Sequence, residues 1–432
     1  MQERLSRLAQ LPRGRRGTLL VALTLLALAL RLAWGWGALA HDLSLVDQGD
    51  YASYRQAARH FLKRGDFNNS HFLVRPPAFP LLIALAGQNV TLIITFNALI
   101  GTLLTPLTWL LARRLALGQG SALLAALLVA VDPLGIRYTA FLGPGSLAFV
   151  GALAMMLGLV ALVQARTQGR VFLWAVFAAL MLLLSVYARP SIYALPLILV
   201  LWLLWTSRRH WPAIVVFALI SLAGMQLWVN HNAAVFGNPT FSTVGTWTLA
   251  WYRAVPVLRL ATGMSVQESE AQVLAAVQAR IGGDPMSANR HDWLAAGPEV
   301  EQALLGVSLE IFRDHPFAWL ATFPTGFLRL YGLVPPLSPR SEVFNPVHYP
   351  LLLWNWSLML LAVVGLWRLL RERHWIVFWC LFLIIAYFSA GTLLVKSAGM
   401  IGRESRIVLP FLAIAALYGA PWLLARLRGR GK

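Results

Sequence analysis

The stretch HWIVFWCLFLIIAYFSAGTLLV, residues 374–395, contains no Asp, Glu, Lys or Arg. A transmembrane helix needs about 20 consecutive, mostly apolar residues, so this run is long enough to cross a bilayer. Comparable runs recur, and they lie near residues 17–40, 91–112, 117–133, 145–164, 171–187, 190–206, 211–229, 349–368, 374–395 and 407–426. The sequence therefore predicts an all-α, polytopic integral membrane protein with about ten transmembrane helices.

Composition supports the same fold class. Of the 432 residues, 58% are hydrophobic and only 12% are charged, and the mean hydropathy is +0.66. These values exclude a soluble globular protein of ordinary composition. The first apolar run is too long for a removable signal peptide, and no small-residue cleavage motif precedes Asp42, so we expect it to remain as a membrane anchor.

The net charge of +19 follows the positive-inside rule rather than a nucleic-acid-binding surface. With ten spans and both termini in the cytoplasm, the arginine-rich connections all fall on the cytoplasmic side. These clusters are Arg4 to Arg16, Arg113 with Arg114, Arg166 with Arg170, Arg208 with Arg209, Arg368 to Arg373, and Arg426 to Lys432. Of the 17 acidic residues, all but Glu3 and Glu372 then face outward. The functional groups are expected on the extracytoplasmic face.

Two outer segments are long, residues 41–90 and 230–348, and together they predict a cap on one transmembrane domain that comprises residues 1–432. The first contains an expected helix at about 50–63 and a short apolar stretch at 79–86, which we interpret as interfacial. Segments 266–281 and 299–313 have the spacing of amphipathic helices. Residues 317–333 are expected to be interfacial or re-entrant, because a further span would reverse the later charge pattern.

The first outer segment carries a concentration of polar residues. Asp50 and Tyr54 share one stripe of the expected helix, whereas Arg55 and Arg59 share another. Asp50 and Asp47 are candidate catalytic carboxylates. The alternative interpretation makes Asp47 an N-cap and Asp50 its capping-box partner.

Downstream in the same segment, Arg75-Pro76-Pro77 fixes an extended backbone, because the residue before a proline is kept out of the α region. On the tripeptide alone, an ordinary transition from loop to helix is the favoured interpretation.

A cationic cluster lies near the C-terminus, between the last two spans and on the outer side. It consists of Lys396, Arg403 and Arg406, with Glu404 among them. The positive-inside rule disfavours cations here, and arginine forks match phosphate oxygens, so the cluster predicts a phosphate-binding site. Snorkelling of boundary side chains is the alternative.

Other polar residues at membrane boundaries are weaker candidates for substrate binding: Asp132, Arg137, Arg189, His231 and Asn232. No pair or cluster of histidines indicates a metal site, so no metal ligand is assigned and any cofactor remains unknown. Phosphate-binding glycine loops, GxSxG elbows and zinc spacings are absent. The single cysteine, Cys380, lies in an apolar run and is interpreted as packing.

Taken together, these motifs resemble the GT-C superfamily of polyprenyl-phosphate-sugar-dependent glycosyltransferases, and in particular its protein mannosyltransferase and lipid A aminoarabinose transferase branch. The matching segments occur in the family's order along the whole chain. They are Asp50-x-x-x-Tyr54-x-x-x-Ala58, Gly65, Arg75-Pro76-Pro77-Ala78-Phe79-Pro80, Ala188-Arg189-Pro190, Asn230-His231-Asn232 and Glu404-Ser405-Arg406.

The resemblance implies a GT-C bundle that transfers a sugar, with inversion, from a polyprenyl-phosphate donor to a lipid, glycan or protein acceptor. It also implies that Asp50 is the general base, with Asp47 in reserve. Arg403 and Arg406, followed by Lys396 and Arg189, are then the candidates for the donor phosphate. Tyr54, Arg75, Asp132, Arg137, His231, Asn232 and Glu404 are supporting residues, and no nucleic acid is involved.

The chain departs from the family at two places. Many members have an acidic residue where this chain has Gly143-Pro144-Gly145-Ser146, and an arginine where it has His231. A non-catalytic member is therefore one alternative, and a transporter or flippase for polyprenyl lipids is another. Transporters usually place ionisable groups near the bilayer midplane, whereas the charges here gather at one face, which favours the enzyme.

Overall fold

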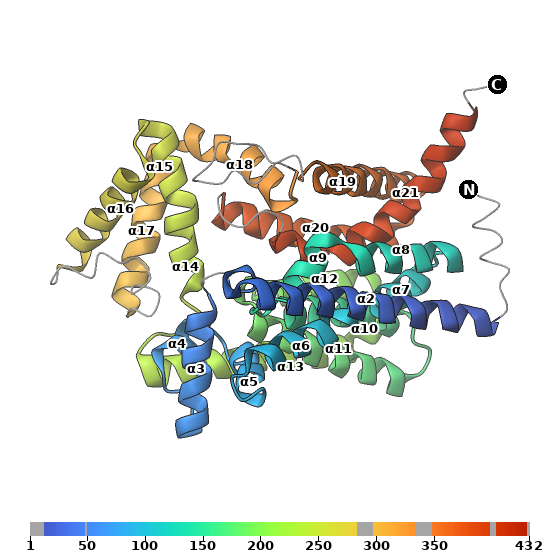
Figure 1. The fold of residues 1–432 in the computed structure, drawn as a ribbon, viewed down its shortest axis with the longest axis horizontal. Coiled ribbons are helices and arrows are strands. Elements are labelled where there is room, and N and C mark those ends of the chain that lie inside the picture. The colour runs from blue at the N-terminus through green and yellow to red at the C-terminus, as the bar shows by residue number, and fades with distance from the viewer. Residues whose placement is uncertain (1–12, 48–49, 283–296, 334–347, 398–402, 430–432) are drawn as a thin grey trace.

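A computed structural model describes residues 13–47, 50–282, 297–333, 348–397 and 403–429. In these ranges every regular element is helical. The long helices lie roughly side by side, and α3–α5 and α14–α17 gather at one end of them (Figure 1). The two long outer segments predicted from the sequence thus share one end of the bundle. Helix α2 begins, and helix α21 ends, at the opposite end.

The bundle accounts for each of the predicted apolar runs. Seven helices in the described ranges are long and apolar enough to span a membrane, or eight if the pair α8 and α9, bent by 60° at Asp132, is one span. The remaining two predicted runs form shorter apolar helices, 190–206 and 409–423, so the expected count of ten is not reached by the length criterion. The chain is a multi-pass membrane protein. The bundle helices are α2 (Arg13–His41), α6 (Val90–Thr102), α7 (Leu104–Arg114), α8 (Gln119–Val131), α9 (Pro133–Thr139), α10 (Gly145–Gln164), α11 (Gln168–Ala188), α12 (Leu195–Thr206), α13 (Trp211–Phe236), α19 (His348–Arg371), α20 (Trp375–Val395) and α21 (Leu409–Gly429).

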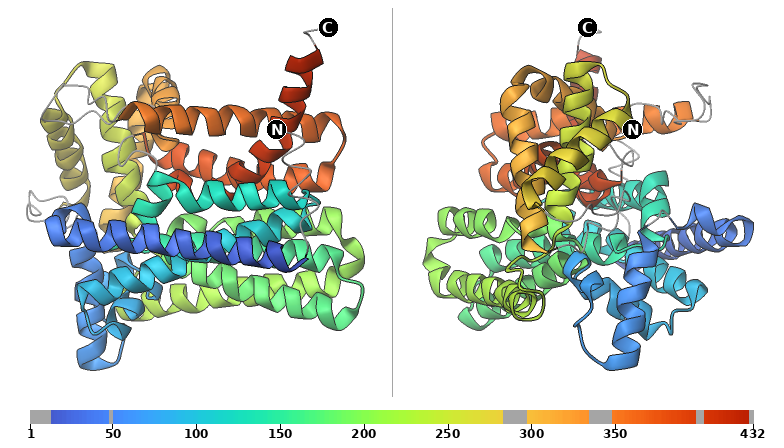
Figure 2. Two further views of the ribbon diagram at one scale, coloured as in Figure 1. Left: turned by 45° about the vertical axis from the view of Figure 1, so that its right-hand side comes forward. Right: turned by 90° about the vertical axis from the view of Figure 1, so that its left-hand side faces the viewer.

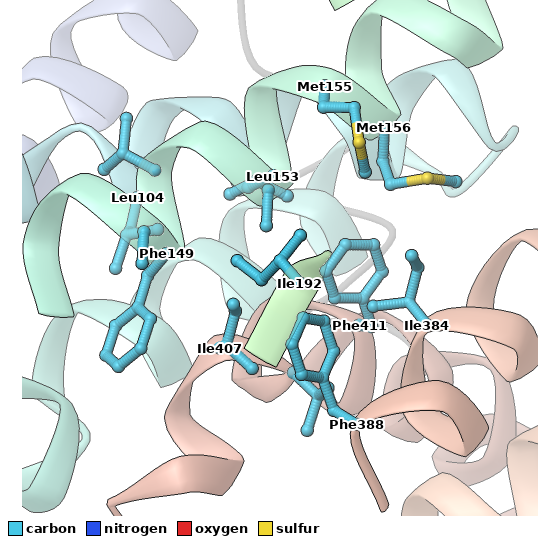
Figure 3. Close-up of a cluster of buried hydrophobic side chains, with 14 of the residues drawn as sticks. Leu104, Phe149, Leu153, Met155, Met156, Ile192, Ile384, Phe388, Ile407 and Phe411 are labelled. Atoms are coloured by element: carbon cyan, nitrogen blue, oxygen red, sulfur yellow. The ribbon is translucent and has the colours of Figure 1, made fainter. Parts of the chain in front are cut away.

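Helix α10 is the centre of the bundle. Of its most apolar window, 94% is buried inside the protein, against 44% for α11. Figure 3 shows Phe149 and Leu153 of this helix in the same cluster as Ile407 and Phe411, which come from the C-terminal part of the chain. A helix that is apolar on every side belongs in the interior, and α10 fits that rule.

Helices α19 and α21 approach each other closely through two glycines. A Cβ atom at Gly365 would overlap the backbone of Ala415, and one at Gly419 would overlap the carbonyl of Leu361. Small residues permit such approaches between transmembrane helices, where dispersion forces drive association. This contact fixes the position of α21 and of the turn that precedes it.

The first outer segment folds as expected around a short amphipathic helix. It contains η1 (Leu43–Leu45), α3 (Tyr51–Arg64), α4 (Ser70–Val74) and α5 (Ala78–Leu85). Gly65 ends α3 in the left-handed conformation, at φ 74°, which glycine adopts at no steric cost. The predicted helix at 50–63 is thereby confirmed within one residue at each end.

The second outer segment has a small hydrophobic core of its own, which includes Trp247, Trp251, Val277 and Leu304. The predicted amphipathic helices are confirmed as α16 (Val266–Ile281) and α17 (Pro298–Asp314). Helix α18 (Pro316–Leu330) is not among the candidate spans, as expected. The remaining helices are η2 (Pro190–Ile192), η3 (Arg208–His210), α14 (Val244–Leu249), η4 (Ala250–Ala254) and α15 (Val255–Thr262).

Hydrogen bonds to backbone carbonyls join the outer segments to one another and to the end of α20. The Ser242 hydroxyl donates to the Val74 carbonyl at 2.7 Å, and the Thr243 amide donates to the Leu73 carbonyl at 3.3 Å. The Ser397 amide, just after α20, donates to the Tyr252 carbonyl at 2.8 Å. Three segments that are distant in sequence therefore meet at one end of the bundle, seen from two further directions in Figure 2.

Candidate active site

Asp50 lies at the start of α3, where it could have capped the helix but does not. It occupies the N-cap position with φ −78° and ψ −23°, and its side chain makes no capping hydrogen bond. The capping-box interpretation is therefore wrong for Asp50, and Asp47 is not the N-cap of this helix. Because the Asp50 side chain does not cap the helix, its carboxylate is available for other partners.

Two arginines hold that carboxylate, one on each oxygen. Arg75 Nη2 donates to Asp50 Oδ1 at 2.7 Å, and Arg403 donates to Oδ2 through Nη2 at 3.2 Å and Nη1 at 3.3 Å. The Asp50 side chain is 34% exposed, whereas each arginine side chain is 11% exposed. The carboxylate is partly exposed, and the two arginine side chains are more deeply buried but keep some exposed surface.

The Arg75-Pro76-Pro77 motif and the Tyr54 ring explain how the Arg75 side chain is oriented. Arg75 has an extended backbone, at φ −121° and ψ 94°, which is the conformation that Pro76 imposes on the preceding residue. Its guanidinium lies 4.8 Å from the centre of the Tyr54 ring, and Tyr54 in turn packs edge-on against Phe79. Asp50, Tyr54 and Arg75, which the sequence analysis selected separately, form one cluster.

Arg403 reaches this cluster from the other end of the chain. It precedes the short helix η6 (Glu404–Ile407), and its guanidinium also lies 5.5 Å from the centre of the Phe141 ring. The Lys396 ammonium lies 5.2 Å from the centre of the Tyr252 ring and adds its positive charge to the field at Asp50. Glu404 begins η6.

The electrostatics of Asp50 are dominated by these cations. Burial alone raises the pKa of Asp50, but the charges of Arg75 and Arg403 outweigh that effect and hold the pKa well below the usual range of aspartate. The carboxylate is ionised at physiological pH. It occupies a site with two arginine forks, the geometry that also suits a phosphate group.

A second acidic group, Asp132, lies behind the first in a closed network. Its side chain is completely buried at the bend between α8 and α9, and it accepts hydrogen bonds from the Gly135 amide at 2.6 Å and from Trp354 Nε1 at 2.7 Å. Arg406 Nη1 donates to both of its oxygens, at 2.9 and 3.0 Å. One turn of chain, Arg403 to Arg406, thus binds the carboxylates of both Asp50 and Asp132.

The other predicted residues lie elsewhere. Arg137 is exposed, with its guanidinium 5.7 Å from the Tyr138 ring centre. Arg189 is the C-cap of α11 and directly follows its last residue, Ala188. His231 stacks on Trp228, and buried Asn232 donates to the Thr240 carbonyl at 2.7 Å. Asp47 follows η1, and its charge adds to the effect of burial in raising the pKa of Tyr51.

Two arginines were missed by the sequence analysis. Arg31 is fully buried in α2 and donates to Thr139 Oγ1 at 2.9 Å; a lone arginine inside an apolar run was the signal that could have identified it. Arg253, in the π-helical turn η4, is also fully buried, and all three of its guanidinium nitrogens lack a hydrogen-bond partner in the described structure. It lies 4.1 Å from the Phe323 ring centre. No sequence pattern distinguished it.

Near Gly143-Pro144-Gly145-Ser146, where the resemblance led us to look for an acidic residue, the structure has a neutral pair. Ser146 donates to Asn97 Oδ1 at 2.5 Å, and Asn97 Nδ2 donates to the carbonyls of Phe141 and Gly143 at 2.7 and 3.1 Å. Across the described part of the chain, no group of three His, Cys, Asp or Glu side chains could hold a metal ion.

No protein-family model and no curated protein sequence matches this chain. Among solved structures, it is similar to the oligosaccharyltransferase AglB from Archaeoglobus fulgidus in complex with an inhibitory peptide and a dolichol-phosphate. That match has a TM-score of 0.52 and 12% identity, and it covers 95% of this chain and 50% of the other. The apo form of the A. fulgidus oligosaccharyltransferase gives a TM-score of 0.51 at 12% identity, over 96% and 51% of the two chains.

ArnT from Cupriavidus metallidurans, bound to undecaprenyl phosphate, gives a TM-score of 0.42 at 17% identity, over 95% of this chain and 79% of the other. The fold assignment rests on the AglB matches, in which this chain spans about half the length of the solved structure. The chain shares the transmembrane fold of the A. fulgidus oligosaccharyltransferase.

Proposed function

We propose that this protein is a membrane glycosyltransferase that transfers a sugar from a polyprenyl-phosphate donor to an acceptor hydroxyl on the extracytoplasmic face, with inversion at the anomeric carbon. One observation carries the proposal: a single accessible carboxylate, Asp50, held between Arg75 and Arg403. A base beside two phosphate-binding groups is what this reaction needs, and the GT-C fold is compatible with it.

In the proposed reaction the acceptor oxygen attacks the anomeric carbon as the bond from that carbon to the phosphate oxygen breaks. Asp50 takes the proton of the acceptor hydroxyl. The bonding electrons leave with the phosphate, and Arg75 and Arg403 stabilise its charge. The product is the glycosylated acceptor, and the second product is the free polyprenyl phosphate.

The low pKa of Asp50 needs explanation, because a strongly stabilised carboxylate is a weak base. In the absence of donor, Asp50 is itself the anion that the two arginines bind. A donor phosphate competes for the same guanidinium groups, and each arginine that turns to the phosphate stabilises the ionised carboxylate less. Donor binding would therefore raise the pKa of Asp50 and activate it for proton transfer.

Asp132 and Arg406 have a different role in this proposal. The Arg406 guanidinium is already paired with the Asp132 carboxylate, so Arg406 is assigned to positioning the Arg403 turn rather than to binding the donor. Lys396 supplements the positive field. Arg253, buried without a hydrogen-bond partner, is added as a further candidate for the donor phosphate.

The test uses purified protein in nanodiscs with radiolabelled polyprenyl-phosphate sugars and candidate lipid, glycan and peptide acceptors. Asp50→Asn should lower transfer at least about 100-fold, the usual contribution of a general base. The same substitution should tighten binding of polyprenyl phosphate, because a competing negative charge is removed. Asp314→Asn, at an exposed aspartate of α17, is the matched control and should leave both unchanged.

Either of two results would contradict the proposal: transfer that survives in Asp50→Asn, or binding of polyprenyl phosphate that weakens there. Asp47→Asn, measured alongside, tests the reserve base. A non-catalytic polyprenyl-lipid-binding protein is the second candidate, and the neutral Asn97 and Ser146 pair favours it. That candidate predicts tight lipid binding without consumption of any donor by the wild-type protein.

A further inference from the structure

A second site lies at the far end of the bundle. A pocket of about 400 Å³ opens between the end of α7, the end of α10 and the start of α11. Helix α10 begins at Gly145, where an added Cβ would overlap the carbonyl of Tyr138 in α9, and the helix has 20 residues. At 1.5 Å per residue, Gln164 at its other end is about 30 Å away along the axis. The pocket is thus separate from the Asp50 cluster.

The polar lining of this pocket is cationic. Arg114, Arg166 and Arg170 line it together with Gln164 and Trp174, and no carboxylate does. None of the three arginines has an ion pair among the residues that the structure describes. Three unneutralised guanidinium groups around one hollow attract an anion.

Arg114 is held in place within the pocket. Its Nη1 donates to Gln164 Oε1 at 3.2 Å, and Gln164 Nε2 donates back to the Arg114 carbonyl at 2.8 Å. The guanidinium also lies 5.9 Å from the Trp174 ring centre. A surface arginine that only snorkels needs no such fixation, so this arrangement indicates a formed site.

The start of α11 adds to the positive potential. The helix begins at Gln168, its N-cap Thr167 makes no side-chain capping bond, and no acidic residue lies in the first turn. Arg170 lies in that turn, where a cation opposes the helix dipole. The positive-inside rule explains why arginines occur in this connection, but it explains neither the pocket nor an arginine at this place in the helix.

Exposed apolar side chains lie beside the pocket, where a lipid could pack against them. Leu173, which lines it, is 64% exposed, and Phe172 beside it is 37% exposed. These side chains belong to a membrane-spanning helix and face outward, toward acyl chains. Basic pockets between transmembrane helices on the cytoplasmic side are typical sites for the headgroups of anionic phospholipids.

We infer that this pocket binds the phosphate of an anionic phospholipid headgroup in the leaflet opposite the Asp50 cluster. Arg166, Arg170 and the fixed Arg114 contact the phosphate oxygens, and the acyl chains lie along Leu173. The inference does not depend on the proposed glycosyltransferase activity.

The experiment compares the full-length protein in nanodiscs of phosphatidylcholine alone and of phosphatidylcholine with phosphatidylglycerol. Native mass spectrometry of the released protein reports retained phosphatidylglycerol. Arg166→Gln with Arg170→Gln should lower retention about ten-fold or more, since each arginine near a membrane surface contributes substantially to anionic lipid binding. The control, Arg208→Gln with Arg209→Gln, removes the same charge from two exposed arginines of another connection and should retain the lipid like the wild type.

Three outcomes would overturn the inference. Equal loss in both double variants would mean diffuse charge attraction without a site, and no loss in either would mean that the pocket arginines do not bind lipid. Displacement of the lipid by millimolar inorganic phosphate would identify a site for a small free anion. Unfolding temperatures in phosphatidylcholine alone should be equal for all three proteins, which shows that the exposed substitutions leave the fold intact.

Discussion

At the scale of single residues, the central feature is that the Asp50 side chain has two cationic partners and makes no capping hydrogen bond to the helix that follows it. Its interactions with Arg75 and Arg403 make it both an ionised carboxylate and the occupant of an anion-binding site. The same side chain thus serves as a candidate base and as a resident competitor of the donor phosphate. The pH dependence of the reaction depends on whether the two arginines bind the Asp50 carboxylate or the donor phosphate.

The two arginines set the expected pH profile. Because they lower the pKa of Asp50 in the free protein, kcat/KM should stay flat as pH falls from about 8 to about 5 and decrease only below the usual aspartate range, near about 4. The stabilising ion pairs are likewise complete above that range and are lost only as pH falls through the lowered pKa.

In the donor complex the phosphate draws the arginines away, so the acid limb of kcat should lie at a higher pH than the acid limb of kcat/KM. Steady-state rates measured across pH for one donor and acceptor pair give both profiles. Coincident limbs, or a kcat limb at the lower pH, would disprove competition between Asp50 and the phosphate.

The buried pair of Asp132 and Arg406 belongs to stability. Arg406→Met leaves an enclosed carboxylate without its cation and should cost about 3–5 kcal/mol. Arg406→Met combined with Asp132→Asn removes the uncompensated charge and should recover much of that loss. Arg137→Met, at an exposed arginine of α9, is the control and should have little effect.

Thermal unfolding of the three variants in the same detergent provides the measurement. If the double variant is no more stable than Arg406→Met, the enclosed charge is not the cause of the loss.

At the scale of elements, the α19 and α21 contact determines where the Arg403 turn lies. Gly365→Val places a branched side chain against the backbone of Ala415, and overpacking of this kind costs about 1–3 kcal/mol or more. Since η6 leads directly into α21, the displaced helix should also reduce transfer. Gly37→Ala in α2, where no atom lies within 4 Å of the added Cβ, is the matched control.

Unfolding temperature and transfer rate should fall together in Gly365→Val and stay at wild-type values in Gly37→Ala. A Gly365→Val protein with normal stability would show that the helices have an alternative packing.

In the cap, by contrast, one buried side chain is expected to lower the stability of the fold. Arg253 in η4 is buried without a hydrogen-bond partner in the described structure, and burial lowers its pKa to about 10. Arg253→Met should raise the unfolding temperature, since an apolar side chain removes the cost of burying a charged group that lacks a hydrogen-bond partner.

If Arg253 serves the donor phosphate, transfer should fall at least about ten-fold in the same variant despite its higher stability. Calorimetry and the transfer assay on one preparation distinguish the two effects. A stabilised variant with full activity would remove Arg253 from the proposed site.

At the scale of the whole molecule, the bundle separates two groups of arginines, each of which we propose to bind an anion. The cap end contains the Asp50 cluster and the far end contains the arginine pocket, and helix α10 extends between these ends. The positive-inside rule predicts arginine-rich connections at one end of the bundle and acidic residues at the other. The arginine pocket lies at the first of these ends, and Asp50 lies at the second.

The sequence by itself determined the fold class, the apolar runs and the helices of the outer segments, because hydropathy and periodicity are local properties that lipid and water impose on each segment. It also selected Asp50, Tyr54, Arg75 and Arg403 as candidates. It did not separate Arg403 from Arg406, which are three positions apart and bind different carboxylates, and it missed Arg253. Those distinctions depend on side chains that meet across 353 positions for Asp50 and Arg403 and 274 positions for Asp132 and Arg406. Only the tertiary structure decides that, because it brings the start of α3 and the bend before α9 to the turn that precedes α21.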